Sequence, residues 1–380
     1  MRTLLKLLAL LLLLAVAAAG AAWWWTTQPL SLAAEKVEIS VPQGASTRAA
    51  AAKAVEGGVQ THPDLLGWYF RLAGREQTIK PGDYAVTRGM TPADLLGKLV
   101  RGDRIVLTVT LVEGWTFKQF REALAKAEHL RHDTQALTAA EIMKTLGKPG
   151  LAAEGRFFPD TYHYFKNASD IDVLRQSLQL MDRRLQAAWD ARAPGLPLKS
   201  ADEALVLASV VEKETGLPKD RPEIAGVFIN RLKIGMRLQT DPTVIYGLGD
   251  AFDGNLRRSH LQADTPFNTY TRAGLPPTPI AMPGKASLMA AVQPAQTKAL
   301  YFVARGDGSS HFSGSLDEHN RAVNKYQRGG AVSAASAAGG NGRWRSRVCS
   351  SASTASTAPA SRRTSRRWRA PFAPPAAPWC

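Results

Sequence analysis

Residues Leu205-Val-Leu-Ala-Ser-Val-Val-Glu-Lys-Glu-Thr-Gly216 form the stretch around which this chain is organised, an apolar run that ends in two carboxylates before a glycine. The pattern predicts a buried helix whose last turn carries Glu212 and Glu214. Loss of solvation raises the pKa of a carboxyl group and suits it to act as a general acid near neutral pH. The alternative interpretation is that both groups only solvate the end of a core helix. Because residues two apart lie on nearly opposite helix faces, at most one of them can point into a given cleft.

The chain of 380 residues is long enough for about two domains, and its formal charge of +16 is unevenly distributed. Eight of its arginines lie after Gly329, where the sequence contains no Asp or Glu. That distribution argues against nucleic acid as a partner. The chain before this tail is only moderately basic, which suits a partner with acidic groups such as an anionic membrane surface or a wall polymer. Both cysteines, Cys349 and Cys380, lie in this tail, so the main body has no disulfide and no cysteine-based metal site. The His and Asp residues lack metal-ligand spacing, and we expect no metal and no cofactor.

Residues 1–25 are predicted to be a cytoplasmic stub and a transmembrane anchor. The run from Leu4 to Trp25 is almost wholly apolar, and its length of about twenty residues matches a hydrocarbon core of roughly 30 Å. Positive charge at its start and three tryptophans at its end place the N-terminus in the cytoplasm and the bulk of the chain outside it. The alternative is a cleaved signal peptide, because small residues of the cleavage type occur within the run.

Residues 37–112 are predicted to form a small α+β module. Val37, Ile39 and Val41 alternate as in a strand, and Thr91 followed by proline is a typical helix start. Helices are predicted from Ser46 to Val55 and from Asp64 to Leu72, and a strand from Ile105 to Val112. This order of elements resembles the LysM-like module, a small fold that binds sugar polymers. The alternative is a spacer domain.

Residues 113–328 are predicted to form a larger α+β domain. Its other predicted helices run from Lys118 to about His129, from Asp170 to Trp189 and from Glu223 to about Lys233. The segment Glu154-Gly-Arg-Phe-Phe-Pro-Asp-Thr-Tyr-His-Tyr164 is rich in aromatic residues, which indicates core packing more often than a sugar platform. Residues 235–247 and 266–280 are interpreted as polar loops that can bind hydroxyl and acetamido groups.

Five motifs of this domain resemble one known family. They are Leu207-Ala-Ser-Val-Val-Glu-Lys-Glu-Thr215, Val227-Phe-Ile-Asn-Arg-Leu232, Gly235-Met-Arg-Leu-Gln-Thr-Asp-Pro-Thr-Val-Ile-Tyr-Gly247, Asn268-Thr-Tyr270 and Gly274-Leu-Pro-Pro277. Over roughly residues 1–328 the chain resembles the MltG (YceG-like) family of endolytic murein transglycosylases. Thr278 and Met282 stand where the family usually has Gly and Asn, which leaves the course of that loop open.

The resemblance implies cleavage of the β-1,4 bond between N-acetylmuramic acid and N-acetylglucosamine in nascent peptidoglycan glycan strands. The product would carry a 1,6-anhydro-muramoyl end, and cleavage would terminate strand elongation. By the same resemblance Glu214 is the catalytic carboxylate, a choice that the residues alone leave open. One carboxylate suffices if the C6 hydroxyl of the sugar replaces the second carboxylate that a hydrolase needs.

The resemblance also implies where the protein works. We expect a single-pass protein of the inner (plasma) membrane with its catalytic domain on the periplasmic or extracytoplasmic side. Penicillin-binding synthases are implied as partners, and no nucleic acid is expected.

Six further residues are predicted to line the saccharide groove, and fixing of the loops is the alternative role for each. They are Gln239, Thr240, Asp241, Asn268, Thr269 and Tyr270. Two other functions stay open from the sequence. A hydrolytic muramidase would pair Glu214 with a second carboxylate such as Asp241, and a non-catalytic scaffold would only bind peptidoglycan.

Residues 329–380 are a low-complexity basic tail of Ala, Ser, Arg, Pro and Trp that cannot bury a core. This tail is predicted to be disordered or to result from a frameshifted reading. For the whole chain the prediction is an α+β fold with one N-terminal transmembrane helix, a small LysM-like module and a larger α+β catalytic domain.

Overall fold

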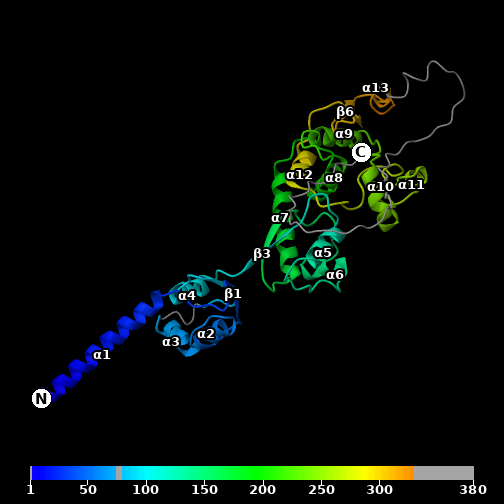
Figure 1. Ribbon diagram of the computed structural model, residues 1–380. Coiled ribbons are helices and arrows are strands. Elements are labelled where there is room, and N and C mark those ends of the chain that lie inside the picture. Colours follow the sequence, from blue (N-terminus) through cyan, green and yellow to red (C-terminus); the bar gives the residue numbers. More distant parts are fainter. Residues whose placement is uncertain (1, 74–78, 329–380) are drawn as a thin grey trace, which may run out of the picture. The chain divides into compact units, whose positions relative to one another are not determined.

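The computed structural model describes residues 2–73 and 79–328, which contain helices and two-stranded antiparallel sheets. This mixture confirms the predicted α+β class, and the predicted tail lies outside the described residues (Figure 1). The chain divides into two compact units. The first consists of Met1–Thr110, Glu122–Ala136 and Thr161–Val173, and the second of Leu111–Arg121, Leu137–Asp160 and Leu174–Cys380. The predicted domain limits, 37–112 and 113–328, stay a prediction.

Helix α1, Arg2–Thr27, is the apolar N-terminal segment of the first unit. Its part Lys6–Thr27 is long and apolar enough to cross a membrane. Side chains such as Leu12 and Leu13 are exposed rather than packed against protein. A signal sequence has the same composition, so the helix supports an anchor without fixing its topology.

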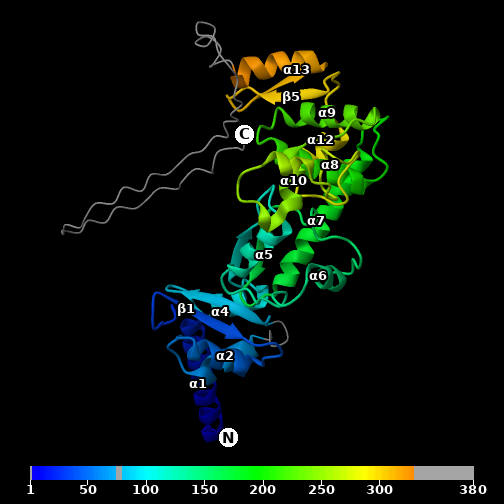
Figure 2. The same cartoon turned by 90° about the vertical axis from the view of Figure 1, so that its right-hand side faces the viewer.

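The core of the first unit combines a two-stranded sheet with three helices (Figure 2). Strands β1, Lys36–Val41, and β2, Gly82–Thr87, pair antiparallel with Val37 opposite Val86. The helices are α2, Thr47–Glu56, α3, Pro63–Leu72, and α4, Pro92–Arg101. Two predicted helix starts are confirmed, because the Ser46 side chain accepts the Ala49 N–H and Thr91 forms a capping box with Asp94.

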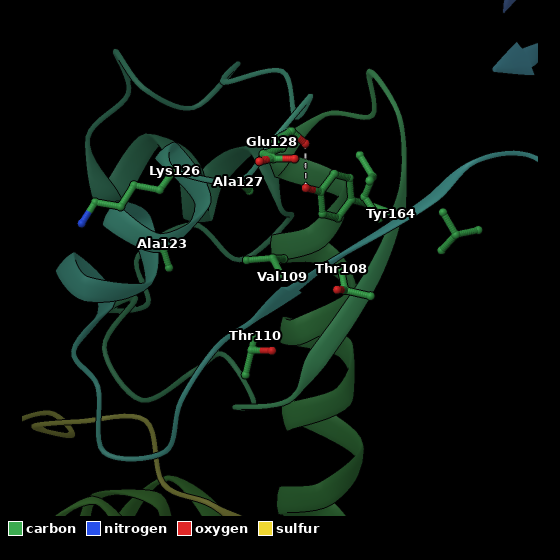
Figure 3. A pocket seen from close by; sticks show the side chains of 10 residues that line it. Thr108, Val109, Thr110, Ala123, Lys126, Ala127, Glu128 and Tyr164 are labelled. Atoms are coloured by element: carbon green, nitrogen blue, oxygen red, sulfur yellow. Dashed lines mark hydrogen bonds between the residues drawn. The ribbon is translucent and has the colours of Figure 1, made fainter. Parts of the chain in front are cut away.

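A second sheet of this unit pairs β3, Val106–Thr110, with β4, Thr161–Phe165, in antiparallel register. Beside β3, at the end of helix α5, Phe117–Ala125, lies an open hollow of about 520 Å³ (Figure 3). The Tyr164 hydroxyl donates a hydrogen bond of 2.7 Å to the Glu128 carbonyl oxygen at its wall. None of the predicted site residues lines this hollow.

The second unit is built around helix α8, Ala201–Glu214, the stretch that the sequence singled out. It packs against α9, Arg221–Lys233, α12, Lys285–Val292, and the long helix α7, Asp170–Asp190. All residues of α8 from Ala204 to Val211 are buried. Burial of each large aliphatic side chain among them stabilises the fold by about 1.5–3 kcal/mol. The polar end of the helix is therefore held by a rigid core.

The remaining elements of the second unit are short. They are α6, Ala139–Thr145, α10, Asp241–Leu248, η2, Gly249–Ala251, α11, Arg258–Gln262, β5, Tyr301–Ala304, β6, Ser310–Ser313, α13, Leu316–Val323, and η3, Asn324–Arg328. Helix α10 shows that the prediction of a loop over residues 235–247 was wrong in its second half. Pro242 fits the first turn of α10 because an N–H there would have no helical acceptor.

The aromatic segment after Glu154 has the predicted core role. Phe157 and Phe158 are buried in the second unit, and Tyr162 and Tyr164 are buried in the first. The Phe157 ring stacks on that of Phe117, with 4.9 Å between the ring centroids. These rings therefore pack the interior and are not free to hold a sugar face.

Candidate active site

Glu214 is the last residue of α8, and the hydroxyl of a buried threonine donates a hydrogen bond to its carboxylate. The Thr240 Oγ1 atom donates a hydrogen bond of 2.6 Å to Glu214 Oε2. Burial raises the pKa of Glu214 to about 7, and the charge of Asp241 acts in the same direction. The Thr240 hydrogen bond and the charge of Arg231 oppose that rise. Glu214 can therefore hold a proton and release it near neutral pH.

Hydrogen bonds to neighbouring threonines hold Thr240, the residue that donates to Glu214, in place. It is buried, its backbone N–H donates to Thr269 Oγ1 at 3.1 Å, and its carbonyl accepts the Thr243 hydroxyl at 2.8 Å. The Thr243 and Thr269 hydroxyls are themselves 2.9 Å apart. This threonine cluster holds the hydrogen-bond donor of Glu214 in one position.

Asp241 and Tyr270 form a second pair beside Glu214. The Tyr270 hydroxyl donates a hydrogen bond to Asp241 Oδ1, and Asp241 is the first residue of α10. Burial, followed by the hydrogen bond to Asp241, raises the pKa of Tyr270 above its ordinary range, so the tyrosine stays a neutral donor. Asp241 is exposed and Tyr270 half-buried, so both can be reached from solvent.

Gln239 occupies a strained backbone position next to this cluster. Its φ is +50°, a left-handed conformation that residues other than glycine seldom adopt. The Gln239 N–H donates to the Thr269 carbonyl at 3.1 Å, which holds the turn, and its side chain is exposed. Such strain is often found where the surrounding structure positions functional groups.

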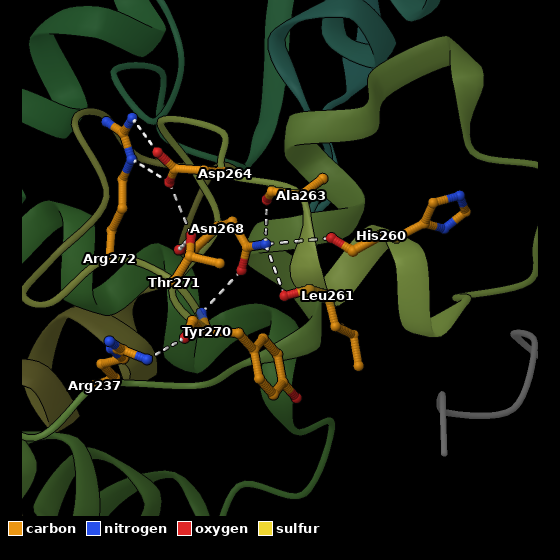
Figure 4. A network of polar contacts seen from close by, with 9 residues as sticks. All are labelled: Arg237, His260, Leu261, Ala263, Asp264, Asn268, Tyr270, Thr271 and Arg272. Carbon is orange, nitrogen blue, oxygen red and sulfur yellow. Dashed lines mark hydrogen bonds and ion pairs between the residues drawn. The ribbon is translucent and has the colours of Figure 1, made fainter.

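Asn268 holds the loop that carries Thr269 and Tyr270 (Figure 4). Its side chain is buried, and its amide donates to the carbonyls of His260, Leu261 and Ala263 at 3.2, 3.1 and 2.6 Å. Its Oδ1 atom accepts the Tyr270 N–H at 2.9 Å. Asn268 therefore occupies the loop-fixing position that was its alternative interpretation, and a saccharide contact from it stays a prediction.

Glu212 faces a different environment on the other side of α8. Its side chain is only 5% exposed and forms an ion pair of 3.2 Å with Arg221 Nη2. The Gly284 N–H donates to its second oxygen at 2.9 Å. A Cβ atom at Gly284 would lie 1.9 Å from Glu113 Oε1, so any other residue there would require the Glu113 side chain to move. The structure thus ties Glu212 to a cation and a backbone amide.

Two charged residues near these groups were not singled out from the sequence. Glu154 is buried, accepts the Phe117 N–H at 3.0 Å and the Tyr246 hydroxyl at 3.2 Å, and has its pKa raised by burial to about 7. Buried Arg231 donates to the carbonyls of Leu238 and Leu300, next to the segment that carries Thr240. Both occur in stretches quoted above, but a solvated charge and a buried one look alike in a sequence.

The predicted site residues therefore fall into two groups. Around Glu214 the structure gathers Thr240, Asp241, Thr269 and Tyr270 through hydrogen bonds or charge. Gln239 and Asn268 form hydrogen bonds to the backbone of the loop that carries Thr269 and Tyr270. Within residues 2–73 and 79–328 no group of three or more His, Cys, Asp or Glu side chains is placed to hold a metal ion. The chemistry that these side chains offer is proton transfer by one carboxyl group.

Comparisons with known proteins agree with the sequence motifs. A sequence model of the YceG-like family matches residues 39–325. A protein of Bacillus subtilis (strain 168) named endolytic murein transglycosylase is 29% identical over 309 residues, which are 76% of this chain and 84% of that protein. A protein of the same name from Streptococcus pneumoniae serotype 2 is 26% identical over 324 residues, 76% of this chain and 58% of that relative. This chain thus spans less than two thirds of the pneumococcal protein.

Solved structures are also similar to this chain. A crystal structure of a YceG-like protein from Listeria monocytogenes has a TM-score of 0.48 and 27% identity, covering 76% of this chain and 98% of that one. The family match and the two relatives named endolytic murein transglycosylase confirm the resemblance drawn from the motifs.

Proposed function

The chain belongs to the YceG-like family, and from that premise we propose that it is an endolytic murein transglycosylase. It cleaves the β-1,4 bond between N-acetylmuramic acid and N-acetylglucosamine inside nascent glycan strands and leaves 1,6-anhydro-muramoyl ends. The observation that carries this proposal is the carboxyl group of Glu214, whose pKa is about 7 and whose hydrogen-bond donor is a preorganised hydroxyl. The names of the relatives support the same reaction class.

The proposed reaction uses Glu214 twice. Its proton moves to the glycosidic oxygen as the bond from C1 to that oxygen breaks, and the N-acetylglucosamine side leaves with a free 4-hydroxyl. The C6 hydroxyl of the muramoyl residue then attacks C1 while the Glu214 carboxylate takes its proton. A bond from O6 to C1 replaces the broken bond, no water is consumed, and Glu214 ends the cycle protonated.

The surroundings of Glu214 suit both halves of this cycle. Burial and the charge of Asp241 favour the protonated acid that starts the reaction. The Thr240 hydroxyl and Arg231 favour the carboxylate that forms once the proton has left. Attack by a hydroxyl of the substrate supplies the effective concentration that a positioned water would otherwise need.

We assign direct saccharide contacts to those predicted groove residues whose side chains are accessible to solvent. Gln239, Asp241 and Tyr270 present a side-chain amide, a carboxylate and a hydroxyl that can bind hydroxyl and acetamido groups. Thr240, Asn268 and Thr269 are buried, and they support these residues and Glu214.

We further propose that α1 anchors the protein as a single-pass helix in the inner (plasma) membrane, with the catalytic domain on the periplasmic or extracytoplasmic side. The apolar run Lys6–Thr27 supports the anchor. In this setting residues 37–112 act as a LysM-like module that binds glycan strands. Cleavage terminates strand elongation beside penicillin-binding synthases, the expected partners.

Product analysis tests the proposed reaction and separates it from its alternatives. The purified full chain is incubated with uncrosslinked glycan strands, and the fragments are identified by mass. Anhydro-ended fragments of internal cleavage are expected. Reducing ends would instead support a muramidase that uses Glu214 with Asp241, and uncut strands with measurable binding would support the scaffold function.

A further inference from the structure

Helix α3 carries an exposed apolar stripe on the face opposite its core contacts. Leu65, Trp68 and Leu72 are 48%, 60% and 81% exposed, and their spacing of three and four residues places them on one face. On the other face Leu66 and Phe70 are fully buried in the core of the first unit. Isolated apolar residues are common on protein surfaces, but a continuous stripe with a tryptophan at its centre indicates a contact surface.

This stripe lies beside the end of the apolar N-terminal helix. The ring of Tyr69 on α3 meets the ring of Trp25 on α1 edge to face, with 6.1 Å between the centroids. Trp25 packs against the core of the first unit, whereas Trp23 and Trp24, the two residues before it, are 72% and 61% exposed. Tryptophans at the end of a spanning helix lie at the level of the lipid headgroups. A helix in contact with Trp25 therefore lies close to that level too.

The charges around the stripe suit a lipid surface. The Arg71 guanidinium lies 6.0 Å from the centre of the Trp68 ring and is exposed. The acidic residue of the same helix, Asp64, is paired with Arg48 at 3.1 Å, which offsets its charge. Tryptophan and leucine next to arginine are typical of helices that lie in the membrane interface and attract anionic headgroups.

We propose that the α3 stripe is a second membrane-contact site, in which Leu65, Trp68 and Leu72 lie in the interfacial layer of the bilayer and Arg71 meets anionic headgroups. The inference rests on the anchor role proposed for α1. A lipid surface is favoured over a protein partner because the stripe is next to Trp25, where a spanning helix would leave the bilayer. A second contact beside the anchor restricts rotation of the first unit about α1.

Spin labelling of the full chain in vesicles tests this site. Cys349→Ser and Cys380→Ser leave one introduced cysteine per variant: Leu65→Cys or Trp68→Cys in the stripe, Leu12→Cys in α1, and Lys126→Cys at an exposed control position of the same unit. The vesicles contain phosphatidylcholine with a minority of phosphatidylglycerol. A nitroxide at each position reports its accessibility to oxygen, which concentrates in the bilayer, and to a water-soluble nickel chelate.

We expect labels at Leu65 and Trp68 to give an oxygen-to-nickel ratio several-fold above that of the Lys126 control and below that of Leu12. A Leu12 label in hydrocarbon with aqueous labels at Leu65 and Trp68 would overturn the contact site and leave the anchor intact. An aqueous Leu12 label would overturn both. Cleavage of soluble glycan strands by the same variants is measured separately, so a failure of the proposed reaction is recognised independently of the membrane result.

Discussion

Glu212 and Glu214 lie on opposite faces of the polar end of α8, and their carboxyl groups have different partners. Glu212 meets the Arg221 guanidinium at 3.2 Å and a backbone N–H. Glu214 meets the Thr240 hydroxyl at 2.6 Å and the unfavourable charge of Asp241. The difference indicates that burial suits a carboxyl group to acid catalysis where no cation forms a direct ion pair with it. A buried carboxylate that is paired with a cation, such as Glu212, is instead expected to contribute to the stability of the fold.

Glu154 extends this comparison to a third carboxyl. As for Glu214, burial raises the pKa of Glu154 to about 7. Its hydrogen bonds, however, come from the Phe117 N–H and the Tyr246 hydroxyl, which join α5 to α10. A raised pKa alone therefore does not identify the catalytic group, and the accessible oxygens of Asp241 and Tyr270 beside Glu214 support the proposal that Glu214 is that group.

Removal of the Arg221 charge should have the largest effect on stability. In Arg221→Met the buried Glu212 carboxylate loses its ion-pair partner, and we expect a loss of about 3–5 kcal/mol in the free energy of unfolding. Chemical denaturation of the variant measures it. The double variant Glu212→Gln/Arg221→Met is the matched control and should lose clearly less. Equal losses in the two variants would show that Arg221 acts through packing rather than through Glu212.

The Glu154 carboxyl should make stability depend on pH. Its pKa is about 7 in the folded protein against an ordinary value of 4.5, so the unfolded state ionises first as pH rises. The contribution of Glu154 to the free energy of unfolding should be fully present below pH 4.5. It should fall by about 3 kcal/mol by pH 7. Unfolding of Glu154→Gln at several pH values should show a smaller decline than the parent. An unchanged decline would contradict the assignment.

The Thr240 hydroxyl should affect activity more than stability. Thr240→Val keeps the shape of the side chain but removes the donor to Glu214, so the carboxylate formed in the reaction is less stable. A hydrogen bond to a charged group contributes about 1.5–3 kcal/mol, which predicts a fall of roughly 10- to 100-fold in kcat. Thr271→Val, which removes a hydroxyl bonded to Asp264, is the control and should retain activity.

The Asp241 charge should have the smallest effect, because exposed charges interact weakly, on the order of 1 kcal/mol at 4 Å in water. Asp241→Asn removes a charge that raises the pKa of Glu214. Glu214 must begin protonated, so the alkaline limb of the pH profile of kcat should move to lower pH. A limb that stays in place while KM rises would assign Asp241 to saccharide binding alone.

The sequence predicted those parts of the fold that rest on local signals. Ser46 and Thr91 mark helix starts by their own capping bonds, and the apolar run before Glu212 predicted the buried helix that the structure has. Helix α10 was missed because the polar residues around Asp241 outweighed the helix-start signal of Pro242.

The division of roles between the carboxyls depends on residues distant in the chain. Arg221 and Gly284 approach Glu212, and Thr240 approaches Glu214, only after folding. Neither spacing nor composition encodes such contacts, so the sequence offered two equivalent glutamates, and the family resemblance made the choice. The buried state of Glu154 was missed for the same reason.

Single-turnover cleavage of glycan strands by Glu214→Gln and Glu212→Gln, compared at equal folded concentration, tests the central claim most directly. The amide of Glu214→Gln cannot donate the proton, and we expect the rate of anhydro-end formation to fall about 10²- to 10⁴-fold with little change in unfolding temperature. Glu212→Gln should keep most of that rate and lose stability. Full activity of Glu214→Gln, or an equal loss of rate in both variants, would contradict the account.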